Sequence, residues 1–253
     1  MSGFRWFRRA APLAGLLALL LWPGAGARAA DAFTPAQRAE IVQIVRQALK
    51  QDPSILRDAV AAMQQDDAAK QADAQAMAIA AQKAALLGPA SPFAGNPAAK
   101  VTLIEFFDVR CPYCRQMEPD MAKLLAQDHD LRIIYKDLPI LGPPSVLASR
   151  ALLAAQRQGK YLPMRSLLMA DPPQIDMAMV QAAAAKLGLD WPRLRKDMQS
   201  SAVSDQIRAN LALARALKID GTPAFVLGDT LIPGAIGMAD LQQAIAAQRK
   251  AGG

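Results

Sequence analysis

The sequence of 253 residues predicts an α/β protein with an inserted helical subdomain, preceded by an all-helical N-terminal extension. Three observations predict this class. The apolar run at 101–107 has the length and composition of a buried strand. Residues from about 144 to 217 form a helical block that is punctuated only by Gly and Pro breaks. Residues 31–90 are almost wholly helical in character.

Residues 1–29 are expected to be a signal peptide. Three Arg residues precede an apolar stretch at 10–22 that is short for a bilayer span, and residues 27–29 offer an Ala-x-Ala cleavage site. An uncleaved anchor is the alternative, but the small residues after Pro23 argue against it. We therefore expect an exported protein, whose cysteines meet an oxidising compartment.

Export changes the interpretation of the charge. Segment 1–29 holds four Arg and no acid, so its removal leaves 25 basic against 22 acidic residues and lowers the net charge from +7 to +3. The basic balance is thus partly a property of the signal peptide. It gives little support for nucleic-acid binding, and we expect no nucleic-acid partner.

The extension at 31–90 is predicted to contain two helices. Thr34 is an expected N-cap with Pro35 at the first helical position, and apolar residues then recur at helical spacing from Ile41 to Leu49. The segment 52–54 ends this helix and starts a second one.

The second helix is expected from about 55 to 87, ending at Gly88. Its repeat is a degraded heptad, rich in alanine and interrupted by charge. It could be a solvated spacer. We favour an oligomerisation arm, because the apolar face of the first helix has few other places to be buried, and we therefore expect a homo-oligomer through residues 31–90.

Residues 91–253 are predicted to form a second domain, which starts near Phe93 after a linker and turn region. Its elements, in order, are strand 101–107, helix 112–127, a strand at about 131–135, the helical block, a hairpin of 224–227 and 230–232, and helix 238–248. This order is that of a thioredoxin fold with an inserted helical subdomain.

The only two cysteines form the tetrapeptide Cys111-Pro112-Tyr113-Cys114 at a predicted strand-to-helix junction. Two thiols one helical turn apart can close a small ring, and the first lies where backbone N–H groups stabilise a thiolate. We expect Cys111 to be the nucleophile and Cys114 the resolving thiol.

Two other uses of the cysteines are weaker. A purely structural disulfide across three residues would constrain the unfolded chain little. A structural zinc ion wants four ligands, and the sequence has no other cysteine; the single histidine, His129, lies in a polar stretch that is typical of a solvated turn. We expect neither a metal site nor a cofactor.

Thr222-Pro223 comes just before the third core strand. Taken alone, this Pro is a strand-entry residue with a trans bond. In a thioredoxin fold, it would be a cis proline facing the cysteines and would expose the Thr222 backbone to an extended substrate. We expect Pro112 and Tyr113 to contact the substrate as well.

Glu105 is an acid inside the apolar strand 101–107. It could face outward. The functional interpretation is a buried acid with a raised pKa that takes and returns the Cys114 proton through water. Lys136, at the end of the second strand, is a candidate charge partner for this carboxylate.

The sequence resembles the DsbA-like thiol–disulfide oxidoreductases over residues 93–250. The resemblance is carried by the segment 105–114, by Tyr135-Lys136-Asp137-Leu138-Pro139-Ile140-Leu141-Gly142 with Ser145, and by 221–225. Residues 33–40 with Asp52-Pro53 are similar to the N-terminal extension of the ScsC (suppressor of copper sensitivity) group, where the extension mediates oligomerisation. The resemblance implies a periplasmic enzyme that forms, reduces or reshuffles disulfides in protein clients.

One departure bears on the direction of the reaction. The strong oxidases of the family typically have His where this chain has Tyr113, and Tyr supplies no positive charge to stabilise a thiolate. A less stabilised thiolate favours isomerisation over one-way oxidation. The alternatives are a dithiol oxidase recharged by a membrane redox partner, and a copper-tolerance protein in which the two thiolates bind Cu(I).

Overall fold

The computed structural model describes residues 33–170 and 175–251, so the expected signal peptide at 1–29 lies outside the described residues. The chain divides into two compact units, residues 1–61 and 62–253, and the division falls within helix α2 (Ser54–Ala81). In the part of the chain that the structure describes, no helix has both the length and the hydropathy needed to cross a membrane.

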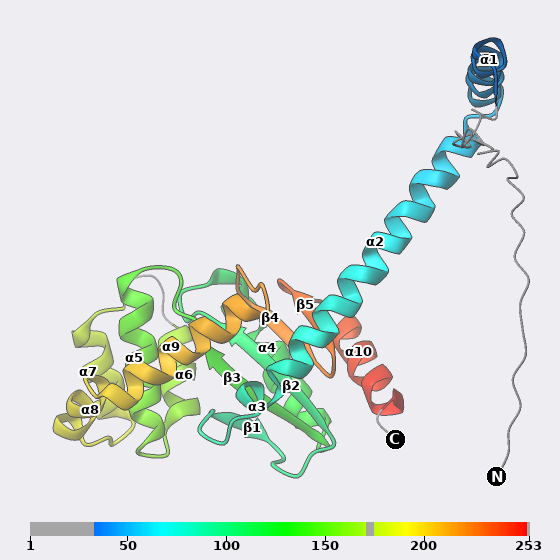
Figure 1. Ribbon diagram of the computed structural model, residues 1–253. Coiled ribbons are helices and arrows are strands. Elements are labelled where there is room, and N and C mark those ends of the chain that lie inside the picture. Colours follow the sequence, from blue (N-terminus) through cyan, green and yellow to red (C-terminus); the bar gives the residue numbers. More distant parts are fainter. Residues whose placement is uncertain (1–32, 171–174, 252–253) are drawn as a thin grey trace, which may run out of the picture. The chain divides into compact units, whose positions relative to one another are not determined.

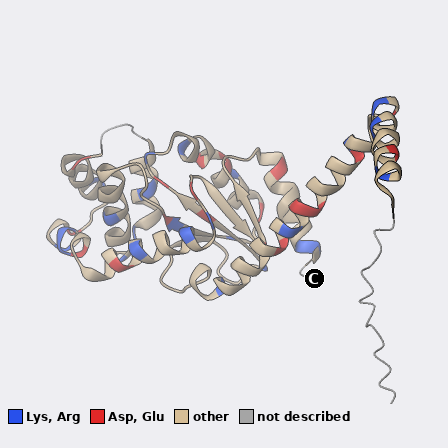
Figure 2. Cartoon of the chain, turned by 45° about the horizontal axis from the view of Figure 1, so that its top comes forward, with Lys and Arg blue, Asp and Glu red and all other residues tan. Residues whose placement is uncertain are grey.

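The first unit contains helix α1 (Pro35–Gln51) and the start of α2. Thr34 is the N-cap of α1, as predicted: its hydroxyl accepts a hydrogen bond from the N–H of Gln37, whose side chain accepts one from the N–H of Thr34. Asp52 starts α2 by accepting hydrogen bonds from the N–H and hydroxyl of Ser54. Along α2, acidic and basic residues are interspersed (Figure 2).

Helix α1 buries none of its residues in the single chain. Its apolar side chains are instead exposed along one stretch of the helix: Ile41, Val42, Ile44, Val45 and Leu49. An exposed apolar face of this kind marks an interaction surface in soluble proteins.

The second predicted helix does not continue to residue 87. It breaks at Gln82, whose N–H is shared between the carbonyl oxygens of Ala78 and Ile79, and a short helix α3 (Lys83–Leu86) follows. Ile79 and Leu86, on either side of the break, are buried in the second unit. The apolar burial compensates for the interrupted helical hydrogen bonding, so this end of the extension is packed rather than solvated.

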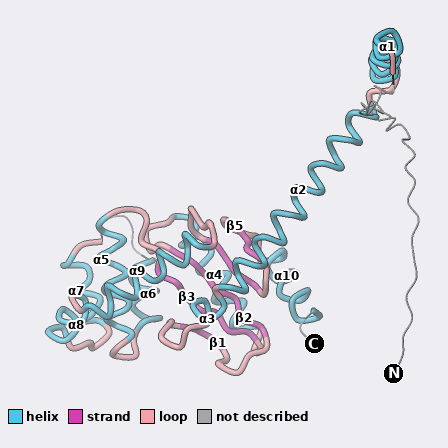
Figure 3. Tube along the Cα trace, viewed as in Figure 1, coloured by secondary structure: helices cyan, strands magenta, loops and turns pink. Residues whose placement is uncertain are grey.

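The second unit is built on a five-stranded sheet of order β1-β3-β2-β4-β5 (Figure 3). The strands are β1 (Phe93–Gly95), β2 (Val101–Phe107), β3 (Leu131–Asp137), β4 (Ala224–Leu227) and β5 (Thr230–Pro233). Among the strands of the described residues, β2 and β3 pair in parallel and the other pairs are antiparallel. The prediction missed β1 and ended β3 two residues early, while the strand 101–107 and the hairpin are confirmed.

Helices cover both faces of the sheet. On one face, Leu103 and Phe107 pack in a core shared with α4 (Pro112–Gln127), α10 (Met238–Ala251) and the helical insert. On the other face, Ile104 and Phe106 pack with α3, the end of α2 and α9. Alternate residues of β2 therefore belong to different cores, as the period of a strand requires.

The predicted helical block is confirmed: its described residues form five helices between β3 and β4, and α5 to α8 gather at one end of the sheet (Figure 1). They are α5 (Pro143–Gln156), α6 (Tyr161–Ala170), α7 (Met177–Lys186), α8 (Trp191–Met198) and α9 (Ser201–Ala216). Three of the helices begin at a side-chain cap, provided by Asp176, Asp190 and Ser200.

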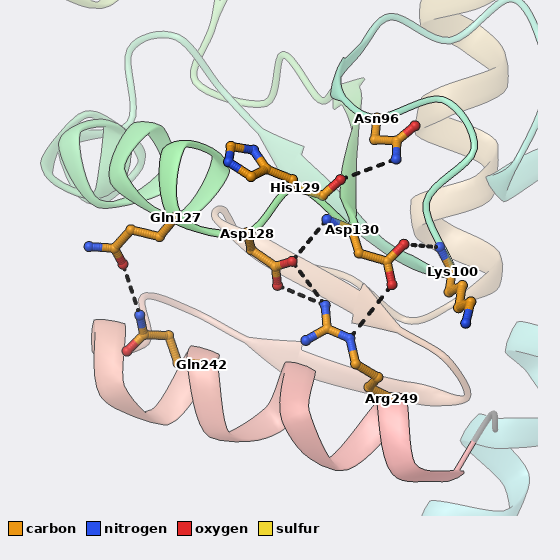
Figure 4. A network of polar contacts seen from close by, with 8 residues as sticks. All are labelled: Asn96, Lys100, Gln127, Asp128, His129, Asp130, Gln242 and Arg249. Carbon is orange, nitrogen blue, oxygen red and sulfur yellow. Dashed lines mark hydrogen bonds and ion pairs between the residues drawn. The ribbon is translucent and has the colours of Figure 1, made fainter.

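Polar contacts fix the loop between α4 and β3 (Figure 4). Arg249 of α10 donates to both carboxylate oxygens of Asp128, at 3.0 and 2.8 Å. The side-chain amide of Asn96 donates to the backbone oxygen of His129 at 3.1 Å, while the His129 side chain is exposed, as predicted. These contacts hold the loop at the end of the domain away from the cysteines.

Candidate active site

Cys111 and Cys114 lie where β2 passes into α4. Cys111 is the N-cap of α4 with extended backbone, Pro112 occupies the first helical position, and Cys114 lies in the first turn. Both cysteines are free thiols and both are buried. This is the predicted strand-to-helix junction, at which the helix N-terminus favours negative charge on the first sulfur.

The segment 222–223, distant in the sequence, reaches the first cysteine. The Cys111 thiol donates a hydrogen bond to the carbonyl oxygen of Thr222, with 3.1 Å between Sγ and O. The Thr222–Pro223 peptide bond is cis, and β4 begins at the next residue. The structure therefore brings Thr222 and Pro223 to Cys111, while their contact with a substrate remains a prediction.

Asp108 joins two loops at the site. One carboxylate oxygen accepts from the N–H of Arg110 at 2.8 Å, and the other accepts from Ile140 and Leu141 at 2.9 and 3.0 Å. The second loop thereby lies beside the cysteine loop. Sequence reasoning did not single out Asp108, although an acid directly after a buried strand is a common loop-fixing residue.

The surface beside the cysteines is apolar and exposed. Tyr113 has 60% of its surface exposed, and Ile140 and Leu141 are exposed by 41% and 42%. Side chains of this kind offer contact area to an extended apolar segment. Tyr113 is thus exposed between the cysteines and Pro112 starts the helix, while contact of either residue with a substrate remains a prediction.

Glu105 is fully buried, as the functional interpretation predicted. Burial raises the pKa of its carboxyl to about 7, although the guanidinium of Arg165 opposes the rise. Burial also raises the pKa of the Cys114 thiol well above its usual range, a hydrogen bond with the backbone of Asp108 opposes this, and the charge of Glu105 adds to it. Proton exchange between this carboxyl and the second thiol remains a prediction.

The predicted charge partner of Glu105 is wrong. Glu105 pairs in parallel register with Tyr135, so Lys136 is opposite Phe106 and projects to the other face of the sheet. The actual partner is Arg165 of α6, whose Nη2 lies 3.2 Å from Oε2 of Glu105. The only sequence signal for it is a lone charge within an otherwise apolar helix.

Comparison with known proteins shows the family to which the chain belongs. The family model for the DSBA-like thioredoxin domain matches residues 102–246, and the model for the copper resistance protein ScsC N-terminal domain matches residues 37–70. The chain belongs to the DSBA-like thioredoxin domain family. With the paired thiols beside the Thr222–Pro223 bond, this membership supports a thiol–disulfide oxidoreductase of the DsbA or ScsC type.

Solved structures of oxidoreductases resemble this DSBA-like protein. A thioredoxin-like oxidoreductase from Silicibacter pomeroyi is 39% identical, with 66% of this chain and 97% of that chain covered and a TM-score of 0.64. Proteus mirabilis ScsC in a transitional conformation is 34% identical, with coverage of 86% and 97% and a TM-score of 0.63. BcfH of Salmonella enterica Typhimurium is 30% identical, with coverage of 86% and 97% and a TM-score of 0.69.

Curated relatives of the DSBA-like domain include longer proteins. The Na(+)/H(+) antiporter NhaA 3 of Salinispora tropica is 32% identical over 133 residues, which are 52% of this chain. The match spans 20% of the antiporter's length. The likeness therefore covers about half of this chain and a fifth of the antiporter.

Lys136 of the DSBA-like domain is a buried cation with neutral partners. Its ammonium donates to the backbone oxygen of Ala85 and to the hydroxyl of Ser91, both at 2.7 Å. Burial lowers the pKa of Lys136 to about 8. The side chain thus fastens α3 and the following linker to the sheet.

Asp137 is a second buried acid that sequence reasoning missed. Its carboxylate accepts a hydrogen bond from the Tyr161 hydroxyl at 2.8 Å, and its backbone oxygen accepts from Asn210 at 3.1 Å. Burial raises the pKa of Asp137 to about 7. Asp137 therefore ties β3 to two helices of the insert.

Among residues 33–170 and 175–251, no three His, Cys, Asp or Glu side chains are grouped to hold a metal ion.

Proposed function

We propose that the protein reshuffles disulfides in protein clients. The observation that carries this proposal is one contact. The Cys111 thiol, which is the expected nucleophile, donates a hydrogen bond to the carbonyl oxygen of Thr222, where an extended substrate is expected to bind. The Cys111 thiolate attacks a client disulfide, a Cys111–client disulfide forms, and the other client sulfur leaves as a thiolate. That client thiolate then attacks a further client disulfide and displaces another client thiolate. When a client thiolate attacks the client sulfur of the mixed disulfide, Cys111 leaves as a thiolate and the client keeps a new pairing.

Cys114 provides the second outcome. When the client does not rearrange, the Cys114 thiolate attacks the Cys111 sulfur, the Cys111–Cys114 disulfide forms, and the reduced client leaves. The enzyme then needs a reductant, and we propose a membrane redox partner for this step. Isomerisation is favoured over oxidation because Tyr113, exposed between the cysteines, supplies no positive charge to stabilise the thiolate.

The proposed clients are proteins with exposed, extended segments. The apolar surface of Tyr113, Ile140 and Leu141 supports this choice, because partly unfolded clients present apolar side chains. Next to it, the Thr222 backbone offers a place for strand-like pairing.

We propose that the protein is a homo-oligomer held by its N-terminal segment. Support comes from the exposed apolar face of α1 and from the match of residues 37–70 to the ScsC N-terminal domain. Several catalytic domains around one client would raise the effective concentration of thiols. The proposed location is the periplasm, supported by the features of residues 1–29 and by the 35% identity to a periplasmic thioredoxin-like protein from Salmonella enterica.

The test of this function is the reactivation of a scrambled multi-disulfide protein by the reduced chain. The comparison chain should lack residues 31–61 only, because Ile79 and Leu86 belong to the core of the second unit. We expect reactivation that falls when the segment is removed, in parallel with the loss of the oligomer in light scattering. No reactivation, with fast oxidation of a reduced client by the disulfide form of the chain, would favour the dithiol oxidase instead.

A single charged substitution on α1 tests the role of the oligomer more mildly than the deletion of residues 31–61 does. Ile44→Asp places a charge on the exposed apolar face, and Gln47→Glu adds a charge to the same helix outside this apolar set. We expect the first variant alone to dissociate the oligomer and to lose isomerase activity.

The second candidate function is Cu(I) binding by the two thiolates, which the match to a copper resistance domain favours. Cys114→Ser separates the two functions. An exchange enzyme accumulates mixed disulfides with clients when the resolving thiol is removed, whereas a copper carrier only loses affinity for Cu(I).

A further inference from the structure

Arg165 carries a charge from the helical insert into the core beside the cysteines. Its side chain is only 2% exposed, and its guanidinium forms ion pairs with Glu105 of β2 and Glu118 of α4. Glu118 follows Cys114 by one helical turn and keeps 30% of its side chain exposed. The buried carboxyl of Glu105, the buried guanidinium of Arg165 and the partly exposed carboxylate of Glu118 are therefore joined in one series of ion pairs.

Two aromatic rings fix the position of the guanidinium. The Arg165 Cζ lies 4.5 Å from the ring centroid of Phe107 and 4.4 Å from that of Tyr135. Cation–π contacts of this length are favourable when the cation is desolvated, and they leave the planar group few alternative orientations. The charge is thus held at a fixed place beside the Glu105 carboxylate.

We propose that Arg165 is a positioning residue for thiol–disulfide exchange, because it holds Glu105 as the carboxylate that accepts the Cys114 proton. Glu118, on the solvent side of Arg165, opposes this effect of Arg165 on Glu105. The inference rests on the proposed exchange reaction of Cys111 and Cys114. It assigns to the helical insert a direct part in the chemistry of the cysteines.

The reaction step in which Arg165 takes part is the closure of the Cys111–Cys114 disulfide. A mixed disulfide joins Cys111 to a substrate sulfur, and the Cys114 proton passes to Glu105. The Cys114 thiolate then attacks the Cys111 sulfur, the Cys111–Cys114 bond forms, and the substrate sulfur leaves with its electron pair. The two cysteines are oxidised and the substrate disulfide is reduced. Glu105 later returns the proton to solvent.

The charged and titratable groups around Glu105 and its partner Arg165 come from three elements. Cys114 and Glu118 of α4 and Tyr135 of β3 act on Glu105, whereas Tyr161 of α6 and Asp137 of β3 act on Arg165. Arg165 lowers the pKa of Glu105 and Glu118 raises it. Neutralising either residue should therefore change the pH dependence of closure, and the two changes should have opposite signs.

The experiment mixes the reduced full chain rapidly with an aromatic disulfide whose released thiolate absorbs visible light. The first phase of release reports the attack by Cys111, and the second reports closure by Cys114. Both phases are recorded against pH for the wild type, Arg165→Met, Arg165→Lys and Glu118→Gln. Two matched controls are Arg150→Met, a further Arg of the insert, and Asp120→Asn, a further acid of α4.

We expect Arg165→Met to move the midpoint of the second phase upward by about one pH unit, so that closure at neutral pH slows about tenfold. Glu118→Gln should move the midpoint downward, and Arg165→Lys should restore it toward the wild-type value. The two controls should keep the wild-type midpoint. A role in packing alone predicts slower closure without shifts of opposite sign.

Unmoved midpoints in both variants would overturn the inference. If Arg165→Met fails to fold, Glu118→Gln decides alone: a downward shift supports the inference and an unchanged midpoint refutes it. The proposed function fails in a different way, because a chain without exchange chemistry would show no first phase at all.

Discussion

The Cys111 thiol and the Thr222 carbonyl oxygen are joined by a hydrogen bond of 3.1 Å, although the two residues lie far apart in the sequence. In the proposed function, this bond places the nucleophilic sulfur against a backbone group to which an extended client would bind. Attack and client binding would then occur at one place, with Cys114 in the first turn of α4.

The two cysteines should behave differently when each is replaced by Ser. Cys114→Ser keeps the sulfur at the N-cap and should accumulate mixed disulfides with clients, because nothing resolves them. Cys111→Ser keeps a hydroxyl donor for Thr222 but should form none. Non-reducing electrophoresis of both variants, after incubation with a client, gives the answer. Equal trapping by both variants would reverse or abolish the assigned roles.

Lys136 should make stability rise with pH in the alkaline range. Its pKa is about 8 in the folded chain and 10.5 ordinarily, so the unfolded chain binds more protons between these values. The free energy of unfolding should then rise with pH from about 8 to about 10, by at most about 1.4 kcal/mol per pH unit. Lys136→Met should flatten this part of the profile, measured by denaturant unfolding.

The exposed Lys123 provides the control for this prediction. Lys123→Met should leave the alkaline slope unchanged. Lys136→Met should also speed amide exchange at 83–91, because it removes the hydrogen bonds to Ala85 and Ser91. A variant that retains the wild-type slope would show that Lys136 does not titrate as a buried amine.

Local patterns predicted most of the fold because local chemistry fixes most of its elements. The apolar run of β2, the Thr34 cap of α1 and the Gly and Pro breaks of the helical block each act within a few residues. Strand β1 escaped prediction because three residues carry too little periodicity, and its pairing partner lies on β3.

The charged core was harder to predict, because its partners meet only in the folded chain. The sequence indicated a buried Glu105 from its apolar neighbours, and this was confirmed. It could not indicate Arg165, which is 60 residues away. Nor could it exclude Lys136 before the register of β2 and β3 was known.

Replacement of a glycine by alanine should lower the stability of the folded chain more at Gly95 than at Gly159. Both have positive φ, of 85° and 71°. A Cβ at Gly95 would lie 2.3 Å from the backbone oxygen of Leu131, whereas nothing lies within 4 Å of one at Gly159. Gly159→Ala should cost roughly 1–2 kcal/mol and Gly95→Ala roughly 2–5 kcal/mol, since overpacking adds to backbone strain. Equal losses in denaturant unfolding would refute the steric difference.

Asp137 should make stability fall as the pH rises through the acidic range. Its pKa is about 7 in the folded chain and 3.8 ordinarily, so the folded chain binds more protons between these values. Its contribution is therefore fully present below about pH 4 and is lost as the pH rises toward 7, by at most about 1.4 kcal/mol per pH unit.

Asp137→Asn tests this directly, because the amide oxygen can still accept the hydrogen bond from Tyr161. The variant should lose part of the slope between about pH 4 and 7, and adding Glu105→Gln should remove more of it, since the Glu105 carboxyl also has a pKa of about 7. Denaturant unfolding at several pH values measures both slopes. If the single variant kept the full slope, Asp137 would be ionised throughout this range, and the insert would be tied to β3 by a carboxylate rather than by a protonated acid.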